Sequence, residues 1–113
     1  MPKGRFGVEL THGAEQDLEA IFDYLAENVS PEVATDFLER LLNKVESLER
    51  FPLRGNAPKE LESLGIRDFR QILMSPYRLI YRVIADKVFV MVIADGRRDM
   101  QALLERRLLR RGA

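Results

Sequence analysis

Cysteine is absent from the 113-residue chain, and histidine occurs once, at His12. Without cysteine the chain can form neither a disulfide framework nor a zinc site with thiolate ligands, so its fold must rest on a hydrophobic core. A chain of this length is long enough for one such core, because it buries roughly two thirds of the surface that its unfolded form exposes. We therefore expect one domain over residues 1–113.

Long apolar runs are also absent. The longest, VFVMVIA from Val88 to Ala94, is far shorter than the roughly 20 residues of a membrane-spanning helix. The opening segment, MPKGRFGVEL, has no apolar run of the length that a signal peptide requires. We expect a cytoplasmic protein that makes no contact with a membrane.

The usual catalytic and cofactor motifs are missing as well. The sequence has no glycine-rich phosphate loop, no serine in a nucleophile elbow, and no His, Asp and Glu residues at metal-ligand spacing. His12 stands beside the expected start of a helix, where a lone histidine is more often a solvated residue than a base or a ligand. We therefore expect no cofactor and no metal, and we name no catalytic residue.

The net charge is zero, which argues against indiscriminate binding of nucleic acid, and we expect no sequence-specific contact with it either. The charges are nevertheless unevenly distributed. Residues 1–53 hold five Lys and Arg against eleven Asp and Glu, a balance of −6, and residues 54–113 hold thirteen against seven, a balance of +6. Such asymmetry is typical of an interaction surface. It also arises when acidic helices and a basic sheet simply attract each other, and both interpretations stay open.

Two helices are predicted in the first half of the chain. Thr11 can cap a helix that runs from about Ala14 to Asn28, whose apolar face is formed by Leu18, Ile21, Phe22 and Leu25. Ser30 is a favourable cap for a second helix over residues 31–50, which the dipeptide Phe51-Pro52 ends. The short link between the two helices indicates an antiparallel hairpin.

The second half alternates with a period of two. Strands are predicted at residues 66–74, 77–84 and 88–94, and the short turns between them indicate an antiparallel meander. A further strand at residues 6–10 is expected beside the strand 88–94, which is apolar on both faces and therefore interior. A connector over residues 53–65 holds about one helical turn, and a last helix covers about Met100 to Arg110.

These elements predict the fold class. It is α+β: a small antiparallel β-sheet packed against an N-terminal antiparallel helical hairpin, in the order β-α-α-β-β-β-α.

Six arginines come from the predicted strands and their exit. In YRLIYRV, residues 77–83, Arg78 and Arg82 lie on one face, and the other four are Arg67, Arg70, Arg97 and Arg98. Arginine suits phosphate and carboxylate partners because its fork is planar and always charged. The six can therefore form a basic sheet face for an anionic partner. The alternative, which the sequence alone slightly favours, is that they form structural salt bridges with nearby aspartates and the acidic helices.

Tyr77 and Tyr81 lie on the face opposite Arg78 and Arg82, together with Leu79. Aromatic residues that alternate with apolar ones in this way are more often part of a core or its rim than platforms for stacking bases. We expect both tyrosines to be structural.

Four segments, in this order, resemble the RelE/ParE superfamily of bacterial toxins from type II toxin–antitoxin modules. They are VELTHGAEQDLEAIFDYL, SPEVATDFLERLLNKVESLERFPLRG, GIRDFRQI leading into YRLIYRV, and DGRRDMQALLERRL. The resemblance covers nearly the whole chain and implies a toxin domain of this superfamily.

The branch of the superfamily decides the expected activity. RelE-like members cut mRNA on the ribosome and typically use Lys and Arg on the sheet with a Tyr or His near the C-terminus. Here the closing segment MQALLERRLLRRGA has neither Tyr nor His, and the connector has one lysine, Lys59. Arginine is a poor proton shuttle at neutral pH. The resemblance therefore favours the ParE-like branch, whose members inhibit DNA gyrase by binding it.

The resemblance also implies the partners. We expect a cognate antitoxin that forms a hetero-oligomer with this chain, and DNA gyrase as the target. The arginine face would meet the target or an acidic stretch of the antitoxin, and the antitoxin groove is expected on exposed apolar residues of the helical hairpin and one sheet edge. The alternatives are a ribosome-dependent mRNA endonuclease and a non-toxic binding module of the same fold.

Overall fold

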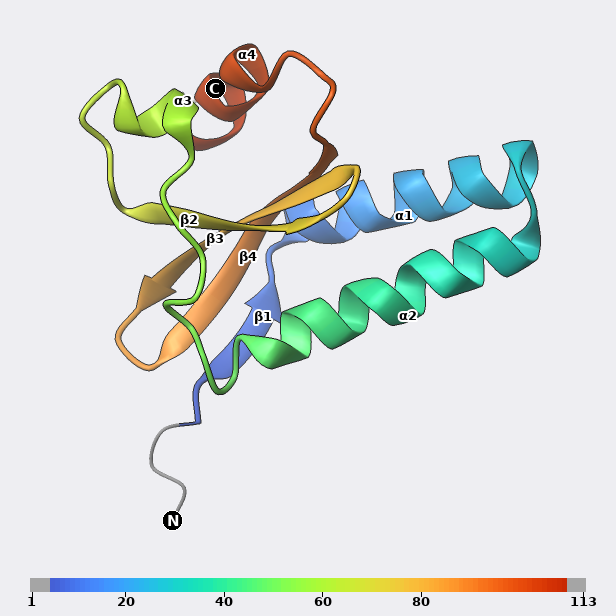
Figure 1. The fold of residues 1–113 in the computed structure, drawn as a ribbon, viewed down its shortest axis with the longest axis horizontal. Coiled ribbons are helices and arrows are strands. Elements are labelled where there is room, and N and C mark those ends of the chain that lie inside the picture. Colours follow the sequence, from blue (N-terminus) through green and yellow to red (C-terminus); the bar gives the residue numbers. More distant parts are fainter. Residues whose placement is uncertain (1–4, 110–113) are drawn as a thin grey trace.

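The computed structural model describes residues 5–109, which form a four-stranded sheet with helices on both faces (Figure 1). The strands lie in the order β1 (Gly7–Leu10), β4 (Lys87–Asp95), β3 (Tyr77–Ile84) and β2 (Phe69–Met74). One face packs against the antiparallel hairpin of α1 (His12–Asn28) and α2 (Pro31–Ser47). The other packs against the short helices α3 (Lys59–Glu62) and α4 (Met100–Leu104). The predicted α+β class is confirmed.

Each long helix begins where its capping residue stands. The hydroxyls of Thr11 and Ser30 accept hydrogen bonds from the N–H groups three residues later, at 3.2 and 3.1 Å. Helix α2 ends at Ser47, three residues earlier than predicted, because the N–H of Leu48 bonds to the carbonyl only three residues back, at Val45. This tighter turn closes the helix before Phe51-Pro52 is reached.

Strand β2 begins at Phe69 and not at the predicted Ile66. Gly65 has a φ of 79°, which glycine adopts without steric cost. The N–H groups of Gly65 and Ile66 bond back to the carbonyls of Glu62 and Leu61 at 2.9 and 3.0 Å. These two bonds form a Schellman motif, so the end of α3 uses the N–H of Ile66 and keeps that residue out of the sheet.

Strand β1 lies beside β4, as predicted, but the two run parallel, with Gly7 opposite Lys87 and Leu10 opposite Val90. The other two pairs are antiparallel, so the sheet is mixed. A parallel pair requires a long crossover between its strands, and the α1–α2 hairpin with the strands after it supplies one.

A β-bulge interrupts the pairing of β4 with β3. Ile80 of β3 lies opposite Val92, but its neighbour Tyr81 lies opposite Val90, so Met91 is left without a partner on β3. Tyr81 and Val90 face the core under the α1–α2 hairpin, whereas Ile80 and Val92 face the core under α3 and α4. The bulge therefore changes which residues of β4 face each core.

The last predicted helix, Met100 to Arg110, is helical through Leu109, and Arg110 lies outside the described residues. Asp99 caps it by accepting a bond from the N–H of Ala102 at 3.1 Å. Beyond α4 the chain continues as a wider, π-helical turn at Glu105–Leu109. Across residues 5–109, none of the helices has both the length and the apolar character needed to cross a membrane.

Candidate functional site

Arg78 is held in a structural ion pair. Its guanidinium donates to both carboxylate oxygens of Glu60 on α3, at 2.8 and 2.9 Å, and its Nε donates to the amide oxygen of Gln71 at 2.8 Å. The hydrogen bonds from Arg78 lower the pKa of Glu60. With 14% of its side chain exposed, Arg78 fixes α3 on the sheet and has little surface left for a partner.

The strand face between Arg78 and Arg82 is covered. Ile80, which stands between them, is fully buried in the core under α3 and α4. The guanidinium of Arg82 lies 5.6 Å from the centre of the Phe69 ring. The open arginine face that the alternation predicts is therefore not formed, because the short helices pack on the middle of that face.

Arg70 lies on the other face of the sheet, contrary to the expected common face. Its register partner is Tyr81, which belongs to the core under the helical hairpin. The Nη1 atom of Arg70 donates to the carbonyls of Leu53 and Gly55, at 3.2 and 2.7 Å. Arg70 thus ties the connector after α2 to the edge strand.

The remaining three arginines are exposed but do not lie together. Arg97 and Arg98 follow β4, at the end of the sheet where Asp95 is paired with Tyr77. Arg67 precedes β2, whose first residue lies at the opposite end. The side chains of Arg67 and Arg97 are 72% and 79% exposed. The structure thus brings Arg97 and Arg98 together and leaves Arg67 apart.

Asp95 and Arg97 form an ion pair within the turn after β4. One carboxylate oxygen of Asp95 accepts from both the backbone N–H and the Nε of Arg97, each at 2.9 Å. These hydrogen bonds lower the pKa of Asp95 to about 2. Because the folded-state pKa is below the unfolded one, the pair stabilises the fold above about pH 4 and loses this effect as the pH falls towards 2.

Replacing Arg97 with Gln should raise the pKa of Asp95 towards the ordinary value of about 3.9, because the side-chain hydrogen bonds are lost. A ¹³C NMR titration of the Asp95 carboxyl measures this directly. Arg98→Gln is the matched control and should leave the midpoint nearly unchanged, since Arg98 acts only through its charge. Equal titration midpoints in the Arg97 variant and the wild type would contradict the assignment.

Both tyrosines of β3 are structural, as predicted. Tyr81 is fully buried, and its hydroxyl accepts a bond from the N–H of Gly55 at 2.9 Å. Tyr77 packs edge-on against Phe37 with ring centres 4.9 Å apart. Burial raises the pKa of each phenol. The Tyr81 hydroxyl is therefore occupied within the core by the N–H of Gly55, and the Tyr77 ring is held against α2.

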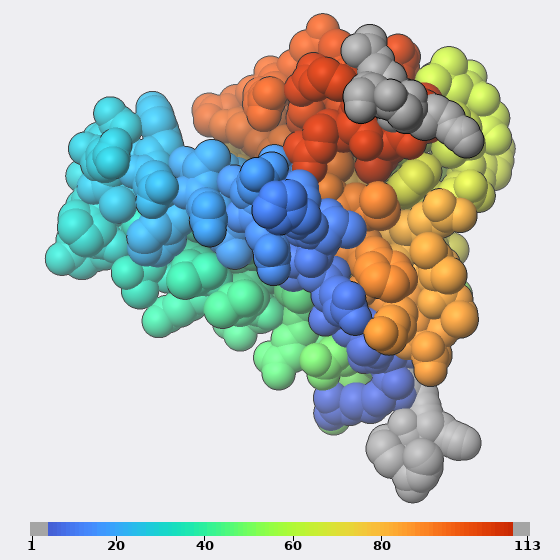
Figure 2. All heavy atoms as spheres, turned by 180° about the vertical axis from the view of Figure 1, so that it is seen from behind, coloured from blue at the N-terminus to red at the C-terminus, as the bar shows by residue number. Residues whose placement is uncertain are grey.

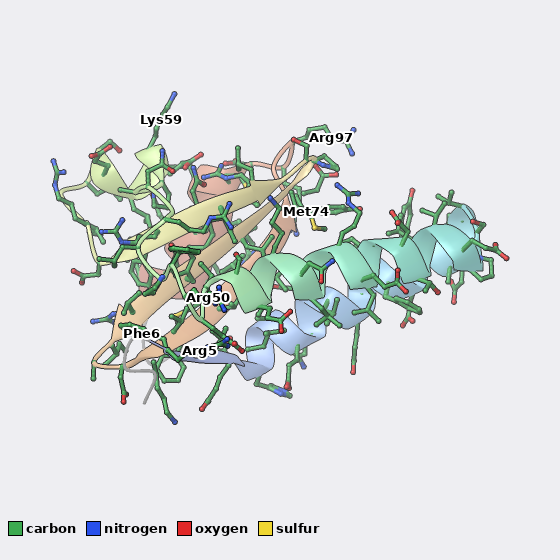
Figure 3. The ribbon with its side chains drawn as sticks, turned by 60° about the horizontal axis from the view of Figure 1, so that its bottom comes forward. Arg5, Phe6, Arg50, Lys59, Met74 and Arg97 are labelled. Atoms are coloured by element: carbon green, nitrogen blue, oxygen red, sulfur yellow. The ribbon has the colours of Figure 1, made fainter. Side chains whose placement is uncertain are left out.

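Two other residues considered from the sequence lie apart from these arginines. Lys59 is exposed at the start of α3, and Figure 3 shows its side chain pointing away from the sheet, far from Arg97. His12 is exposed at the start of α1. Within residues 5–109, no three or more His, Cys, Asp and Glu residues are grouped closely enough to hold a metal ion.

An apolar groove that the sequence did not predict lies between the segment after α2 and the end of β3. The apolar groove encloses about 550 Å³ and is lined by Phe6, Arg50, Phe51, Pro52, Leu53, Arg54, Val83 and Ala85. Phe51 and Leu53 are 63% and 60% exposed, which is high for such large apolar residues. The available signal was the apolar run Phe51-Pro52-Leu53 in a connector, which we interpreted only as the end of a helix.

The rim of the apolar groove is cationic. Among the described residues that line it, Arg50 and Arg54 carry charge and none is acidic. Arg54 is held in place by a 2.7 Å hydrogen bond to the hydroxyl of Ser47. Figure 3 shows Arg50 at the same end of the molecule as Arg5 and Phe6, and at the opposite end from Arg97. Of the two exposed arginine pairs, Arg50 with Arg54 borders this apolar groove, whereas Arg97 and Arg98 are not among its lining residues.

The architecture defines a class of small α+β chains found in solved toxin–antitoxin structures. The chain superposes on one described as the chromosomal ParDE TA system from P. aeruginosa with a TM-score of 0.68, at 19% identity, over 82% of this chain and 98% of that one. A chain of the RelBE2 toxin–antitoxin complex from Mycobacterium tuberculosis gives a TM-score of 0.56, at 20% identity, over 82% and 93%. At these identities the likeness establishes the fold.

The sequence comparisons identify the family. Residues 8–100 match the family model described as the ParE toxin of the type II toxin–antitoxin system parDE. Toxin ParE3 of Caulobacter vibrioides is 30% identical over 94 residues, which are 83% of this chain and 90% of that protein. The chain therefore belongs to the ParE toxin family, which confirms the resemblance to the RelE/ParE superfamily.

Proposed function

We propose that this chain is the toxin of a type II toxin–antitoxin module, that it inhibits DNA gyrase in the cytoplasm, and that a cognate antitoxin neutralises it. The observation that carries the proposal is the match to the ParE toxin family over residues 8–100 together with the 30% identity to Toxin ParE3. Gyrase is the target that the resemblance to the ParE-like branch implies. The fold is similar to that of chains in the ParDE and RelBE2 toxin–antitoxin structures, which supports an antitoxin partner.

The arrangement of side chains favours action by binding over cleavage of RNA. Cleavage needs a group that transfers protons and cations that converge on one phosphate. Tyr81 is fully buried and bonded to Gly55, and Arg78 is bonded to Glu60. These side chains hold the fold together, so they are not free to form such a centre.

For the contact with the target we propose Arg97 and Arg98, the exposed neighbouring pair after β4. A cationic pair at an exposed turn speeds the encounter with an acidic surface and favours the correct partner. Replacing both with Gln should raise the protein concentration needed for half-maximal gyrase inhibition by roughly tenfold. Arg82→Gln, on β3 away from the end where Tyr77 pairs with Asp95, is the matched control for loss of an arginine.

The test is a gyrase reaction on supercoiled plasmid, with and without the purified chain, in which linear DNA is measured after the enzyme is denatured. We expect linear DNA to form in the presence of the chain and to disappear when the antitoxin is added. No linear product and no loss of supercoiling activity, at concentrations that arrest growth in cells, would overturn the gyrase assignment. Cleavage of mRNA only in the presence of ribosomes would then identify the RelE-type activity.

A further inference from the structure

We propose that a cationic cleft beside the second half of α2 binds the phosphate backbone of the duplex DNA on which gyrase acts, whatever its base sequence. The cationic cleft is lined by Arg40, Asn43, Lys44, Ser47, Arg54 and Met74. The proposal rests on the proposed function in one respect, because it takes the DNA held by gyrase as the occupant. It deepens that function by assigning a contact to the nucleic acid in addition to the contact with the enzyme.

Three segments of the chain form the cationic cleft. Arg40, Lys44 and Ser47 are spaced by four and three residues, so they lie on one face of α2. Arg54 comes from the connector after α2, and Met74 from the end of β2. The cleft encloses about 340 Å³. Its arginine, lysine and asparagine side chains all carry N–H donors, which suit the oxygens of a phosphate group.

The cationic cleft is not neutralised by carboxylates. None of the described residues that line it is acidic. The carboxylate of Asp36 lies 4.0 Å from the guanidinium of Arg40, but both side chains are mostly exposed, and such a pair is weak. Lys44 in the last turn also stabilises α2 through the helix dipole. That role accounts for one cation and leaves Arg40 and Arg54 unexplained.

Arg54 is held in place before any ligand binds. Its Nη1 atom donates to the hydroxyl of Ser47 at 2.7 Å, and that hydroxyl donates to the carbonyl of Lys44 at 2.6 Å. Arg70 fixes the connector on both sides of Arg54 through its bonds to the carbonyls of Leu53 and Gly55. Less conformational freedom is therefore lost when a phosphate binds.

Further cations continue the row beyond the cationic cleft. Burial raises the pKa of Tyr77, and the charges of Arg97 and Arg40 oppose this rise, which places both guanidinium groups near its ring. Figure 3 shows Met74 of the cleft between Arg97 at one end of the molecule and Arg50 at the other. A row of this kind favours a linear polyanion over a single phosphate ion.

The length of the row sets the number of phosphates. At 1.5 Å per residue, the helix rises about 10 Å from Arg40 to Ser47, whose hydroxyl holds Arg54. Phosphates on one strand of duplex DNA repeat every 3.4 Å of axis, so this distance spans about three of them. Contacts to phosphates carry no sequence information, which agrees with the expectation of no sequence-specific contact.

The composition of the cationic cleft favours a duplex over a single strand. Proteins hold single strands largely by stacking bases on aromatic rings, and none of the described residues that line the cleft is aromatic. The first half of α2 adds direction, because Glu32, Asp36 and Glu39 line a separate hollow that contains no cation among the described residues. A duplex is therefore attracted to one end of α2 and repelled from the other.

The first experiment measures binding of the purified chain to a short fluorescent DNA duplex of mixed sequence, without gyrase, by fluorescence anisotropy at several salt concentrations. For three phosphate contacts, the logarithm of the association constant should fall with the logarithm of the salt concentration with a slope of about −3. Arg40→Gln with Lys44→Gln should weaken binding roughly tenfold or more and make the slope shallower by about 2. Circular dichroism and the melting temperature check that this variant folds.

The matched control removes the same two residue types from elsewhere on the surface. Lys59→Gln with Arg106→Gln changes the net charge equally, at exposed positions on α3 and after α4, and should bind DNA like the wild type. NMR gives an independent reading of the place of contact. The amide signals of Asn43 and Ser47 should shift when the duplex is added, whereas that of the exposed Glu19 should not.

Four outcomes overturn the assignment of the cationic cleft. These are no DNA binding by the wild type at low salt, equal losses in the cleft variant and the control variant, shifts at Glu19 without shifts at Asn43 and Ser47, and tighter binding of single-stranded or duplex RNA than of the DNA duplex.

The gyrase reaction, run in parallel, separates the cationic cleft from the target. A cleft variant that loses DNA affinity and needs a higher concentration to form linear DNA supports both proposals. DNA binding through the cleft without any gyrase inhibition by the wild type keeps the cleft as a DNA site and removes only the enzyme. Gyrase inhibition that the cleft variant retains in full, with no DNA affinity in either chain, keeps the target and overturns the cleft.

Discussion

Replacing Asp17 with Ala should lower the free energy of unfolding by about 3 kcal/mol. Asp17 on α1 accepts two bonds from the guanidinium of Arg107, at 2.9 and 3.1 Å, and one from the backbone N–H of Ile93 at 2.9 Å. The two side chains are 18% and 24% exposed. Removing Asp17 therefore leaves a mostly buried cation without its counter-ion and a strand N–H without its acceptor, which is the costly way to break an ion pair.

The ion pair also supports the bulge in β4, which explains the size of the expected effect. Arg107 donates to the carbonyl of Met91 at 3.0 Å, and Met91 is the residue that the bulge leaves without a partner on β3. Figure 2 shows the last helical residues, in red, against the start of α1, in blue. One pair of side chains thus joins the bulge, the first helix and the last helix.

The measurement is chemical denaturation followed by circular dichroism. Asp17→Asn should cost less than Asp17→Ala because it keeps an oxygen acceptor, and Glu19→Ala, an exposed change on the same helix, should cost under about 0.5 kcal/mol. In the double variant Asp17→Ala, Arg107→Ala, the free energy of unfolding should fall by less than the sum of the two single effects, with a difference of at least about 1 kcal/mol. Strictly additive losses would mean that the two side chains do not stabilise the fold as a pair.

Local patterns in the sequence predicted the elements well because the causes of those elements are local. Strand β3 has the predicted bounds, Tyr77–Ile84, since its β-branched, aromatic and long side chains suit a strand and short turns flank it on both sides. Thr11 and Ser30 cap the helices from positions that their residue types favour. The predicted start of β2 was wrong. Ile66 is a residue type that suits a strand, but the Schellman motif at Gly65 uses the N–H of Ile66.

The candidate site could be predicted only in part because it depends on long-range contacts. Alternation puts Arg70 on the same face as Ile72 and Met74, so its position on the core side could have been read from the sequence. That α3 would cover the strand between Arg78 and Arg82 could not, since Glu60 meets Arg78 only after the connector folds back over the sheet. The apolar groove has the same origin, because its lining comes from three separate segments of the chain.

Replacing Gly55 with Ala should have the other large effect, a loss of about 3 kcal/mol in the free energy of unfolding. A β-carbon at Gly55 would collide with the backbone carbonyl of Gln71 and would lie 2.8 Å from the hydroxyl of Tyr81. Gly55 is buried where the connector crosses the edge strand, and the N–H of Gln71 bonds to the carbonyl of Asn56 at 2.8 Å. The connector must therefore move away, and its hydrogen bonds to Tyr81, Arg70 and Gln71 weaken together.

Two comparisons separate this steric clash from the general effect of replacing a glycine with alanine. Gly7→Ala on β1 should be nearly neutral, because its new β-carbon would meet the nearest atom, Cγ of Lys87, at 3.9 Å, an ordinary contact. Tyr81→Phe alone should cost about 1–2 kcal/mol by leaving the buried N–H of Gly55 without an acceptor. It should not rescue Gly55→Ala in a double variant, because the carbonyl of Gln71 stays in place. Unchanged stability in Gly55→Ala would refute this placement of the connector against the edge strand.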